Sequence, residues 1–537
     1  MQRTRLSILV LILCPLLAMA QPAAEARVGY EAIRAGDMHA LLSFLASDAL
    51  EGRETGTRGL DLAARFLEAQ FSLYGLTPAP GASSMLQRFD LQLTQITPRT
   101  ALQISTAKTT LHSYQWLEDF FSRNLGNVSS VLEGQVVFAG YGISDPEAGW
   151  DDYKNIDVRG KIVVLLPARN LSSVDAGPLA ELRKKLRPTN ATQGKTAESK
   201  GASAVFYVGP ASIPEMIKDY RRILSAANMS LPQPPAARRF VSLTVSQRVA
   251  DDLLAETGIT AKAWEQKLAS SKKPIHHTLK KARVRLLIDV EQSLASSQNV
   301  VAYLEGRDPL LKKNVVVFSA HYDHLGKNAE GTVYNGADDD GSGTTGVLEI
   351  AQAFARNPVR PKRSVMFIAH AGEEKGLLGS DYFTSHPLVP LENITADLNI
   401  DMIGRNDSDQ VYIIGSDHLS SELHRINEAA NQTVGMKFDY TYNDVNDPNR
   451  FYYRSDHYNF AKRGIPIIFY FTGIHEDYHQ PGDDVDKINF NKMQKIARLI
   501  YLTGWQVANL DHSLVVDRHP PGEPPTGGTS GNPGSRP

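Results

Sequence analysis

Cysteine is almost absent from the 537-residue chain, which has Cys14 as its single cysteine. Cys14 lies in an apolar segment, residues 6–17, which follows two arginines and ends in the small-residue sequence Ala-Met-Ala at 18–20. This pattern predicts a secretory signal peptide over residues 1–20. Cleavage there would leave a chain with no thiol, which excludes disulfides, a cysteine nucleophile and cysteine-ligated zinc.

The sequence also lacks a second long apolar run and an excess of charge. Beyond the leader, no stretch approaches the roughly 20 apolar residues that a membrane helix needs. Lys and Arg number 57 against 59 Asp and Glu, so the formal net charge of -2 offers no extended basic surface to nucleic acid. We expect a secreted or periplasmic protein with no membrane span and no nucleic-acid partner. A lipid anchor on Cys14 is the alternative, which the bulky Leu13 before it disfavours.

The length of the chain predicts more than one core, and the patterning changes along it. A helix is predicted over Asp61–Tyr74, after a glycine-punctuated loop at 50–57. Short β-rich runs at 136–138, 162–166 and 204–208 predict a separate β-rich domain. The expected division is a signal peptide (1–20), the first part of the main domain (27–125), a β-rich inserted domain (130–290), the rest of the main domain (296–512) and a disordered tail (516–537).

From Asn299 onward, strand-like and helix-like segments alternate. This alternation predicts an α/β domain with a mostly parallel, mixed sheet sandwiched by helices. Functional residues in such folds gather at the carboxyl ends of the strands. The predicted elements are strands at 315–318, 365–368, 398–400 and 465–471 and a helix at 344–356.

Polar clusters follow these strands. In His321-Tyr322-Asp323-His324 the outer residues of H-x-D share one strand face, so His321 can bind a metal while Asp323 orients its ring. Asp338, Asp339 and Asp340, flanked by glycines, would repel one another without a cation. The alternatives are a surface polar turn for the first cluster and a solvated acidic helix start for the second.

Three further clusters complete the pattern. On extended backbone, Glu373 and Glu374 would point to opposite sides, which suits a base beside a metal ligand. Asp401 closes a strand, and Tyr478-His479 follows another. Each alone is compatible with exposed glutamates, a turn cap or a polar loop. Together the five clusters supply two histidines and three carboxylates, a set that fits two bridged zinc ions.

These motifs carry a resemblance to a known family. The series resembles the secreted co-catalytic zinc aminopeptidases, which are relatives of glutamate carboxypeptidase and glutaminyl cyclase. The motifs are His321-x-Asp323, Gly336-Ala337-Asp338-Asp339-Asp340-Gly341-Ser342-Gly343, Glu373-Glu374, Asn399-x-Asp401-Met402 and Tyr478-His479-x-Pro481.

The resemblance implies a role for each site residue. The metal ligands would be His321 and Asp401 for one zinc, Glu374 and His479 for the other, and Asp339 as the bridge between them. The catalytic residues would be Glu373 as general base, Asp323 behind His321, and Tyr478 near the oxyanion. The resemblance also implies a cis peptide bond between Asp339 and Asp340.

A second resemblance concerns the insert. The segments 136–142, 158–164 and 200–202 resemble the protease-associated (PA) domain, a β-sandwich-like insert of secreted peptidases. It implies a PA-like domain at 130–290.

Together the motifs and the resemblance predict a zinc-dependent aminopeptidase acting on peptides. A carboxypeptidase or dipeptidase of the same fold would need arginines for a terminal carboxylate, and Arg405 and Arg454 near the motifs could equally be ion-pair partners. The sequence is also compatible with a glutaminyl cyclase that holds one zinc, and with a binding ectodomain that has lost catalysis.

Overall fold

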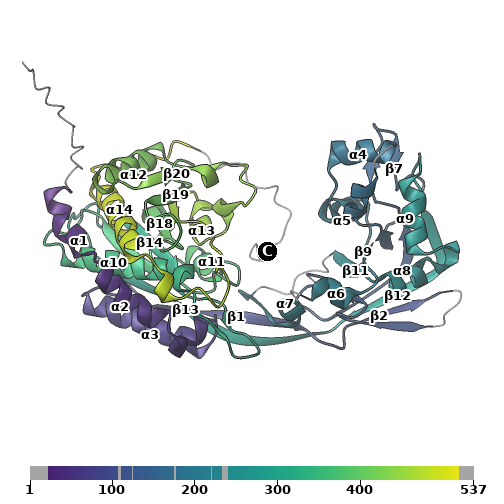
Figure 1. The fold of residues 1–537 in the computed structure, drawn as a ribbon, viewed down its shortest axis with the longest axis horizontal. Helices are drawn as coiled ribbons and strands as arrows, with labels where there is room; N and C mark the ends of the chain where they lie inside the picture. Colours follow the sequence, from purple (N-terminus) through teal and green to yellow (C-terminus); the bar gives the residue numbers. More distant parts are fainter. Residues whose placement is uncertain are drawn as a thin grey trace, which may run out of the picture. The chain divides into compact units, whose positions relative to one another are not determined.

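The structure is a computed structural model. It describes residues 22–106, 111–123, 125–174, 177–218, 221–232 and 240–518. The predicted signal peptide lies outside these residues, as does the tail beyond residue 518. Among the helices within them, none has the length and apolar character to cross a membrane. The chain divides into two compact units, one formed by the residues up to Asp90 together with those from Ala295, the other by Leu91–Leu294 (Figure 1).

A nine-stranded sheet has its centre in the first unit, while some of its residues at one edge, 91–96 and 228–230, fall in the second. Its strands, in spatial order, are β10 (Asn228–Ser230), β1 (Leu86–Ile96), β13 (Val290–Leu304), β17 (Ser364–His370), β14 (Val315–His321), β18 (Ile394–Ile400), β21 (Ile467–Phe471), β19 (Gln410–Ile414) and β20 (Lys437–Asp439). Strands β17, β14, β18 and β21 run parallel, with antiparallel β13 and β19 on either side. The predicted α/β class with a mostly parallel mixed sheet is confirmed.

Strand β14 lies at the point where the strand order reverses. Its neighbours β17 and β18 both follow it in the chain but pair with opposite edges. Every residue of β14 and β17 is buried, as expected for parallel strands that have both faces covered. Such a reversal opens a crevice at the carboxyl ends of the strands. His321 ends β14, His370 ends β17 and Asp401 follows β18, so these residues meet there.

Helices cover both faces of this sheet. On one face α10 and α14 pack against β14, and Phe318 of β14 and Phe367 of β17 contact Phe354 of α10. A Cβ atom on Gly504 of α14 would lie 2.2 Å from the Phe318 ring, so this close packing requires glycine. On the other face Phe383 of α11 contacts Phe460 of α13, which packs on β18 and β21.

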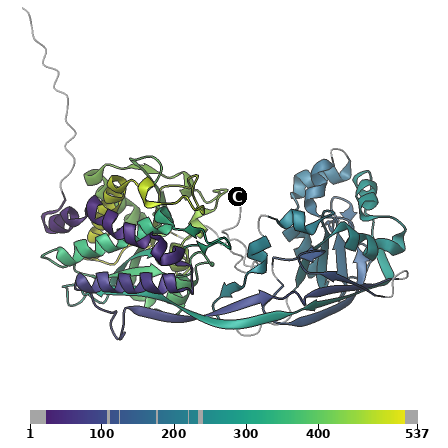
Figure 2. The same cartoon turned by 60° about the horizontal axis from the view of Figure 1, so that its bottom comes forward.

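The helices of the first unit precede and alternate with its strands. They are α1 (Arg27–Ala32), α2 (Ala35–Leu45), α3 (Arg58–Leu73), α10 (Gly343–Arg356), α11 (Leu378–Ser385), α12 (Ser421–Val434), α13 (His457–Ala461) and α14 (Phe490–Asn509), with a small hairpin of β15 (Gly326–Lys327) and β16 (Val333–Tyr334). Helices α2 and α3 lie side by side in both views (Figures 1 and 2), joined by Phe44 and Phe66. The helices predicted at 61–74 and 344–356 are confirmed as α3 and α10.

The second unit is built on a mixed eight-stranded sheet. Its strands, in spatial order, are β3 (His112–Gln115), β2 (Ala101–Ser105), β12 (His277–Ile288), β5 (Ser130–Phe138), β8 (Ile162–Leu165), β9 (Ala204–Val208), β11 (Val241–Val245) and β4 (Phe120–Phe121). The other elements are α4 (Pro178–Leu186), α5 (Asn190–Ser199), α6 (Ile213–Ile217), α7 (Arg221–Ser225), α8 (Gln247–Leu254), α9 (Ala261–Ala269) and the hairpin β6 (Ser144–Asp145) and β7 (Trp150–Asp151).

This architecture differs from the β-sandwich-like insert that the sequence suggested. Strands β5, β8, β9 and β11 are parallel, and alternate residues of β8 enter two different apolar clusters. Ile162 and Val164 belong to one cluster, Val163 and Leu165 to the other. Both faces are therefore buried, as in a central parallel sheet. The unit begins at Leu91 rather than near residue 130, because β2 and β3 join its sheet through β12.

Candidate metal centre

The carboxylate of Asp340 forms hydrogen bonds with three elements at the crevice. Its carboxylate accepts the backbone N–H groups of His321 at the end of β14 (3.2 Å), Met402 after β18 (3.0 Å) and Gly343 at the start of α10 (2.8 Å). Burial raises the pKa of Asp340 well above its usual range, and these donors oppose that effect. Asp340 thus fixes the strand ends rather than facing the crevice.

The other two aspartates of the loop diverge. Asp338 accepts the N–H of Gly404 at 2.6 Å, while the Asp483 carboxylate accepts the N–H groups of Asp338 and Asp339 at 3.0 Å. The three adjacent carboxylates point in different directions: Asp338 and Asp340 accept backbone N–H groups, whereas Asp339 lies beside histidine nitrogens, which relieves the repulsion expected between them. The peptide bond between Asp339 and Asp340 is cis, as the family resemblance implied. Of the three, Asp339 faces the histidines at the crevice.

A first group of ligand-type atoms surrounds one oxygen of Asp339. His321 Nε2 lies 3.3 Å from Asp339 Oδ1 and 3.7 Å from Asp401 Oδ2. The three atoms all lie within 4.8 Å of one another, a spacing at which one cation could contact each of them. Glu373 Oε2 lies 3.9 Å from the same His321 nitrogen, so its carboxylate borders this group.

A second group surrounds the other oxygen of Asp339. His479 Nε2 lies 3.1 Å from Asp339 Oδ2 and 3.3 Å from Glu374 Oε2. His324 Nδ1 lies 3.0 Å from Glu374 Oε1 and 3.8 Å from Asp339 Oδ2. His324, Asp339 and Glu374 meet the same 4.8 Å criterion. The sequence analysis gave His324 no role, although its place three residues after His321 was the available signal.

The donor set suits a metal ion. Within the described residues, both ring nitrogens of His324 and Glu374 Oε1 are buried without a hydrogen bond of acceptable geometry. Burying such groups without partners is costly. Imidazole nitrogens and carboxylate oxygens without sulfur are ligands that zinc accepts, and two groups that share Asp339 provide for a bridged pair.

Gly336 makes room for His324. Its φ of 55° lies in the left-handed region, and a Cβ atom there would lie 2.5 Å from the His324 ring. A side chain at this position would therefore displace the imidazole as well as strain the backbone.

The acids and imidazoles compensate one another electrostatically. Burial opposes protonation of His479, but Glu374 and Asp339 raise its pKa to about 11. Burial likewise opposes ionisation of Glu374, but His479 lowers its pKa to about 2. Glu373 differs, because burial raises its pKa well above the usual range. Burial thus favours the protonated form of Glu373, whereas Glu374 favours the ionised form.

Arg53 supports the site from behind. This residue is 1% exposed. Its guanidinium donates to the backbone carbonyls of Leu45, Tyr322, Asn335 and Gly336. Burial lowers its pKa to about 10, while Asp323 and Asp483 oppose that shift. The sequence analysis assigned the segment 50–57 to a loop and missed this residue, three of whose four partners lie far away in the chain.

Asp323 contacts the base rather than the ring of His321. Its carboxylate accepts the Thr55 hydroxyl at 2.8 Å and the N–H of Glu373 at 3.1 Å. His321 Nδ1 lies 3.1 Å from the Asp323 carbonyl but 3.8 Å from its carboxylate, so the main chain is at hydrogen-bond distance where the sequence suggested the side chain. Glu373 and Glu374 begin a turn instead of lying on extended backbone.

An aromatic pocket adjoins the two groups. Its lining includes ligand-type residues and the base, together with Phe451, Phe471, Tyr478 and Arg454; the former are His321, Asp339, Glu373, Asp401 and His479. The Tyr478 ring stacks on His479 with centroids 3.8 Å apart. Six of the eight residues that the sequence singled out thus line this pocket, and the other two, Glu374 and Asp323, contact His479 and Glu373.

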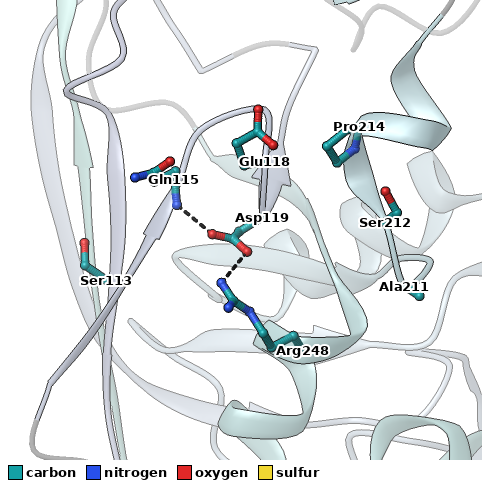
Figure 3. A pocket seen from close by; sticks show the side chains of 8 residues that line it. All are labelled: Ser113, Gln115, Glu118, Asp119, Ala211, Ser212, Pro214 and Arg248. Atoms are coloured by element: carbon teal, nitrogen blue, oxygen red, sulfur yellow. Dashed lines mark hydrogen bonds and ion pairs between the residues drawn. The ribbon is translucent and has the colours of Figure 1, made fainter.

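A larger hollow of about 600 Å³ lies in the second unit (Figure 3). Asp119 is at its centre, where its carboxylate accepts the N–H of Gln115 at 2.9 Å and pairs with Arg248 at 2.7 Å. Glu118 pairs with Arg221 outside it. Its charged groups thus satisfy one another, and it brings together no set of metal ligands.

Known proteins resemble this chain in both sequence and fold. The model of "Peptidase family M28" matches residues 299–503. A probable leucine aminopeptidase 2 from Aspergillus oryzae is 30% identical over 230 residues, which cover 38% of this chain and 44% of that protein. Aminopeptidase YwaD from Bacillus subtilis is 26% identical over 215 residues, covering 38% and 43%. The chain thus spans less than half the length of either relative.

The fold similarity extends further than the sequence match. An aminopeptidase from Aneurinibacillus sp. strain AM-1 superposes with a TM-score of 0.53 at 19% identity, over 93% of this chain and 99% of that one. The matched sequence segment contains every residue of the two ligand groups, from His321 to His479. Residues 299–503 of this chain therefore resemble peptidase family M28 in sequence.

Proposed function

We propose that the protein is a zinc-dependent aminopeptidase that hydrolyses peptides with two zinc ions. One observation carries the proposal: two groups of buried nitrogen and oxygen ligands share Asp339 beside the carboxylate of Glu373. The relatives described as aminopeptidases support the same reaction. We further propose that the protein acts outside the inner membrane, in line with the predicted leader at 1–20.

The ligands divide between the two metal positions. His321 and Asp401 would hold one zinc, Glu374 and His479 the other, and Asp339 both. We add His324 to the second position, because its Nδ1 lies 3.0 Å from Glu374 Oε1. When bound, such a zinc pair supplies a water molecule of lowered pKa and polarises the peptide carbonyl.

Glu373 acts as the general base and acid. Its carboxylate takes the proton of the attacking water, holds it, and delivers it to the nitrogen of the leaving amine. Glu373 Oε2 lies 3.9 Å from His321 Nε2, so the carboxylate borders the first ligand group, where the attacking water would be held. Asp323 keeps the base in place through the Glu373 N–H at 3.1 Å. Proton transfer of this kind contributes roughly 10² to 10⁴ in rate.

Tyr478 is placed to stabilise charge on the substrate. Its phenol lines the pocket beside His479 and can donate a hydrogen bond to the oxygen of the attacked carbonyl. Burial raises the pKa of Tyr478 well above its usual range, so the proton needed for this bond is retained.

Glu373→Gln tests the proposal. We expect the variant to bind two zinc ions per chain like the parent but to lose at least about 10²-fold in kcat on leucine p-nitroanilide. Exposed Glu392→Gln is the matched control and should keep full activity. Chelation should abolish turnover and zinc should restore it.

Substrate panels separate the candidate reactions. An aminopeptidase cleaves leucine p-nitroanilide but not its N-acetyl derivative, a carboxypeptidase cleaves N-blocked peptides, and a cyclase converts N-terminal glutaminyl peptides without hydrolysis. Near-normal activity of Glu373→Gln at full zinc content would remove the base from the proposal. Absence of all turnover at full zinc content would favour a binding protein.

A further inference from the structure

Two arginines near the motifs could meet a substrate carboxylate, and the structure separates them. Arg405 Nη2 lies 2.8 Å from Asp477 Oδ2, and both side chains are largely buried, at 12% and 14% exposed. Arg405 therefore has its carboxylate partner within the protein. Its role is to fix the segment that leads to Tyr478 and His479.

Arg454 is different, because it lines the pocket itself. Its guanidinium lies over the ring of Phe451, 4.8 Å from the centroid, and its Nη2 lies 3.4 Å from the Tyr478 hydroxyl. Within the described residues, no carboxylate of the chain pairs with it. The side chain is only partly exposed.

This placement leaves hydrogen-bonding capacity unused. A guanidinium has five N–H donors, and stacking on an aromatic face occupies none of them. The contact with Tyr478 accounts for one at the limit of hydrogen-bond length. The remaining edge can bind a planar carboxylate through two parallel hydrogen bonds, which are stronger and more specific than neutral ones.

The position of Arg454 relative to Glu373 determines which substrate groups can reach its guanidinium. Arg454 and Glu373 line the same pocket, so a peptide bond presented to the base brings neighbouring substrate groups beside the guanidinium. The ring of Phe451 covers one face of the guanidinium and excludes water from that side of the charge. A free acid on the substrate would pair with Arg454, whereas an apolar group would only replace water.

We propose that Arg454 binds a carboxylate of the substrate and makes the enzyme selective for peptides that carry one near the scissile bond. This inference rests on the proposed peptidase function. The carboxylate has two possible sources: the side chain of an N-terminal Glu or Asp, or the free carboxyl terminus of a dipeptide.

Paired substrates test the two sources with the zinc-loaded full chain. Glutamyl and glutaminyl p-nitroanilides differ only in the charge of the side chain, and Leu-Leu and Leu-Leu amide only in the terminus. We expect the parent enzyme to prefer the charged member of one pair by about tenfold or more in kcat/KM, the size of a charge-assisted hydrogen bond. Equal rates on both pairs in the parent would overturn the inference.

Variants then assign the preference to Arg454. Arg454→Met should bring the charged-to-neutral ratio close to one, and Arg454→Lys should keep part of it, since the charge remains but the planar fork is lost. The matched control is Arg450→Met, an exposed arginine stacked on Tyr453, which should leave the ratio unchanged.

Three other outcomes would contradict either the inference about Arg454 or the proposed peptidase function. A ratio that survives in Arg454→Met refutes the inference. A uniform loss on every substrate would also refute it, because Arg454 would then act through Tyr478. If the parent cleaves none of the four substrates at full zinc content, the proposed function fails instead. Zinc content and thermal unfolding of each variant identify those that have not folded.

Discussion

Arg53 shows how much a single residue contributes to the site without touching a substrate. Its guanidinium donates to four buried carbonyls, two of them in the loop before the aspartates. We predict that Arg53→Met lowers the free energy of unfolding by about 3 kcal/mol or more, because these carbonyls lose their donors in a buried setting. Urea unfolding of the zinc-free protein measures this loss.

The control for this prediction is Arg65→Met on the surface of α3. Arg65 is 59% exposed and pairs with Glu68, an exposed pair of the kind that contributes little. We expect a change below about 0.5 kcal/mol. A loss of similar size in both variants would show that Arg53 has no special role.

A second prediction for a single residue concerns the zinc affinity of His324. We predict that His324→Gln weakens the binding of one zinc ion by about tenfold or more while the other stays bound, because one member of the second ligand group is lost. Competition with a chelator, read out as zinc bound per chain, measures both affinities. Exposed His386→Gln is the control. Unchanged zinc affinity in His324→Gln would show that His324 is not a zinc ligand and only contacts Glu374.

Individual residues also show how much of the site could be predicted from the sequence. The order of motifs from His321 to His479 was sufficient to select residues that the structure brings together. It could not select Arg53 or the unpaired state of Arg454. Their importance depends on partners that lie close only after folding, and one arginine in a loop gives no periodic signal.

At the scale of elements, helix α10 carries a buried acid. Glu349 accepts the N–H of Arg34 at 3.1 Å, and burial raises its pKa from 4.5 to about 7. The unfolded chain releases this proton near pH 4.5, whereas the folded chain keeps it until about pH 7. The free energy of unfolding therefore falls as the pH rises through this window, by at most about 3 kcal/mol from this group.

Glu349→Gln removes that dependence. We predict that the variant gains stability relative to the parent as the pH rises from 4.5 to 8, while the two differ least at pH 4.5. Urea midpoints across this range provide the measurement. Glu392→Gln, exposed in solvent, should track the parent throughout. A constant difference between Glu349→Gln and the parent would show that Glu349 ionises normally in the fold.

Elements with a strong pattern were predictable, and those defined by pairing were not. The strands at 315–318 and 365–368 and the helix at 344–356 have apolar runs or helical periodicity, and they are confirmed as parts of β14, β17 and α10. Strand β3 has a polar sequence and β2 is only five residues long, so neither gives a strong pattern. They become strands because β12 pairs with β2 and β2 with β3, so the sequence placed the start of the insert too late.

At the scale of the whole molecule, each unit has its own core. We predict two thermal transitions, of which zinc removal lowers only that of the first unit, since both ligand groups lie there. At a free zinc concentration of 100 times Kd, the metal stabilises by about 2.7 kcal/mol per site, or roughly 5 °C or more. Calorimetry with and without chelator measures both transitions.

Tryptophan fluorescence can assign each thermal transition to one of the two units. The four tryptophans are Trp116, Trp150 and Trp264 in the second unit and Trp505 in the first. In Trp505→Phe, fluorescence reports the second unit alone. Its midpoint should not respond to chelator while the calorimetric transition of the first unit does. A chelator effect on this fluorescence would show that the two units unfold together.

Because the strand order reverses around β14, the ligand residues that meet there are synthesised at different times. The ligand groups draw on β14, β18 and the segment after β21, so the last ligand, His479, leaves the ribosome long after the first. A nascent chain that already displays His321 and Asp339 still lacks the imidazole that closes the second group. The second ligand group can therefore form only after residue 479 has been synthesised.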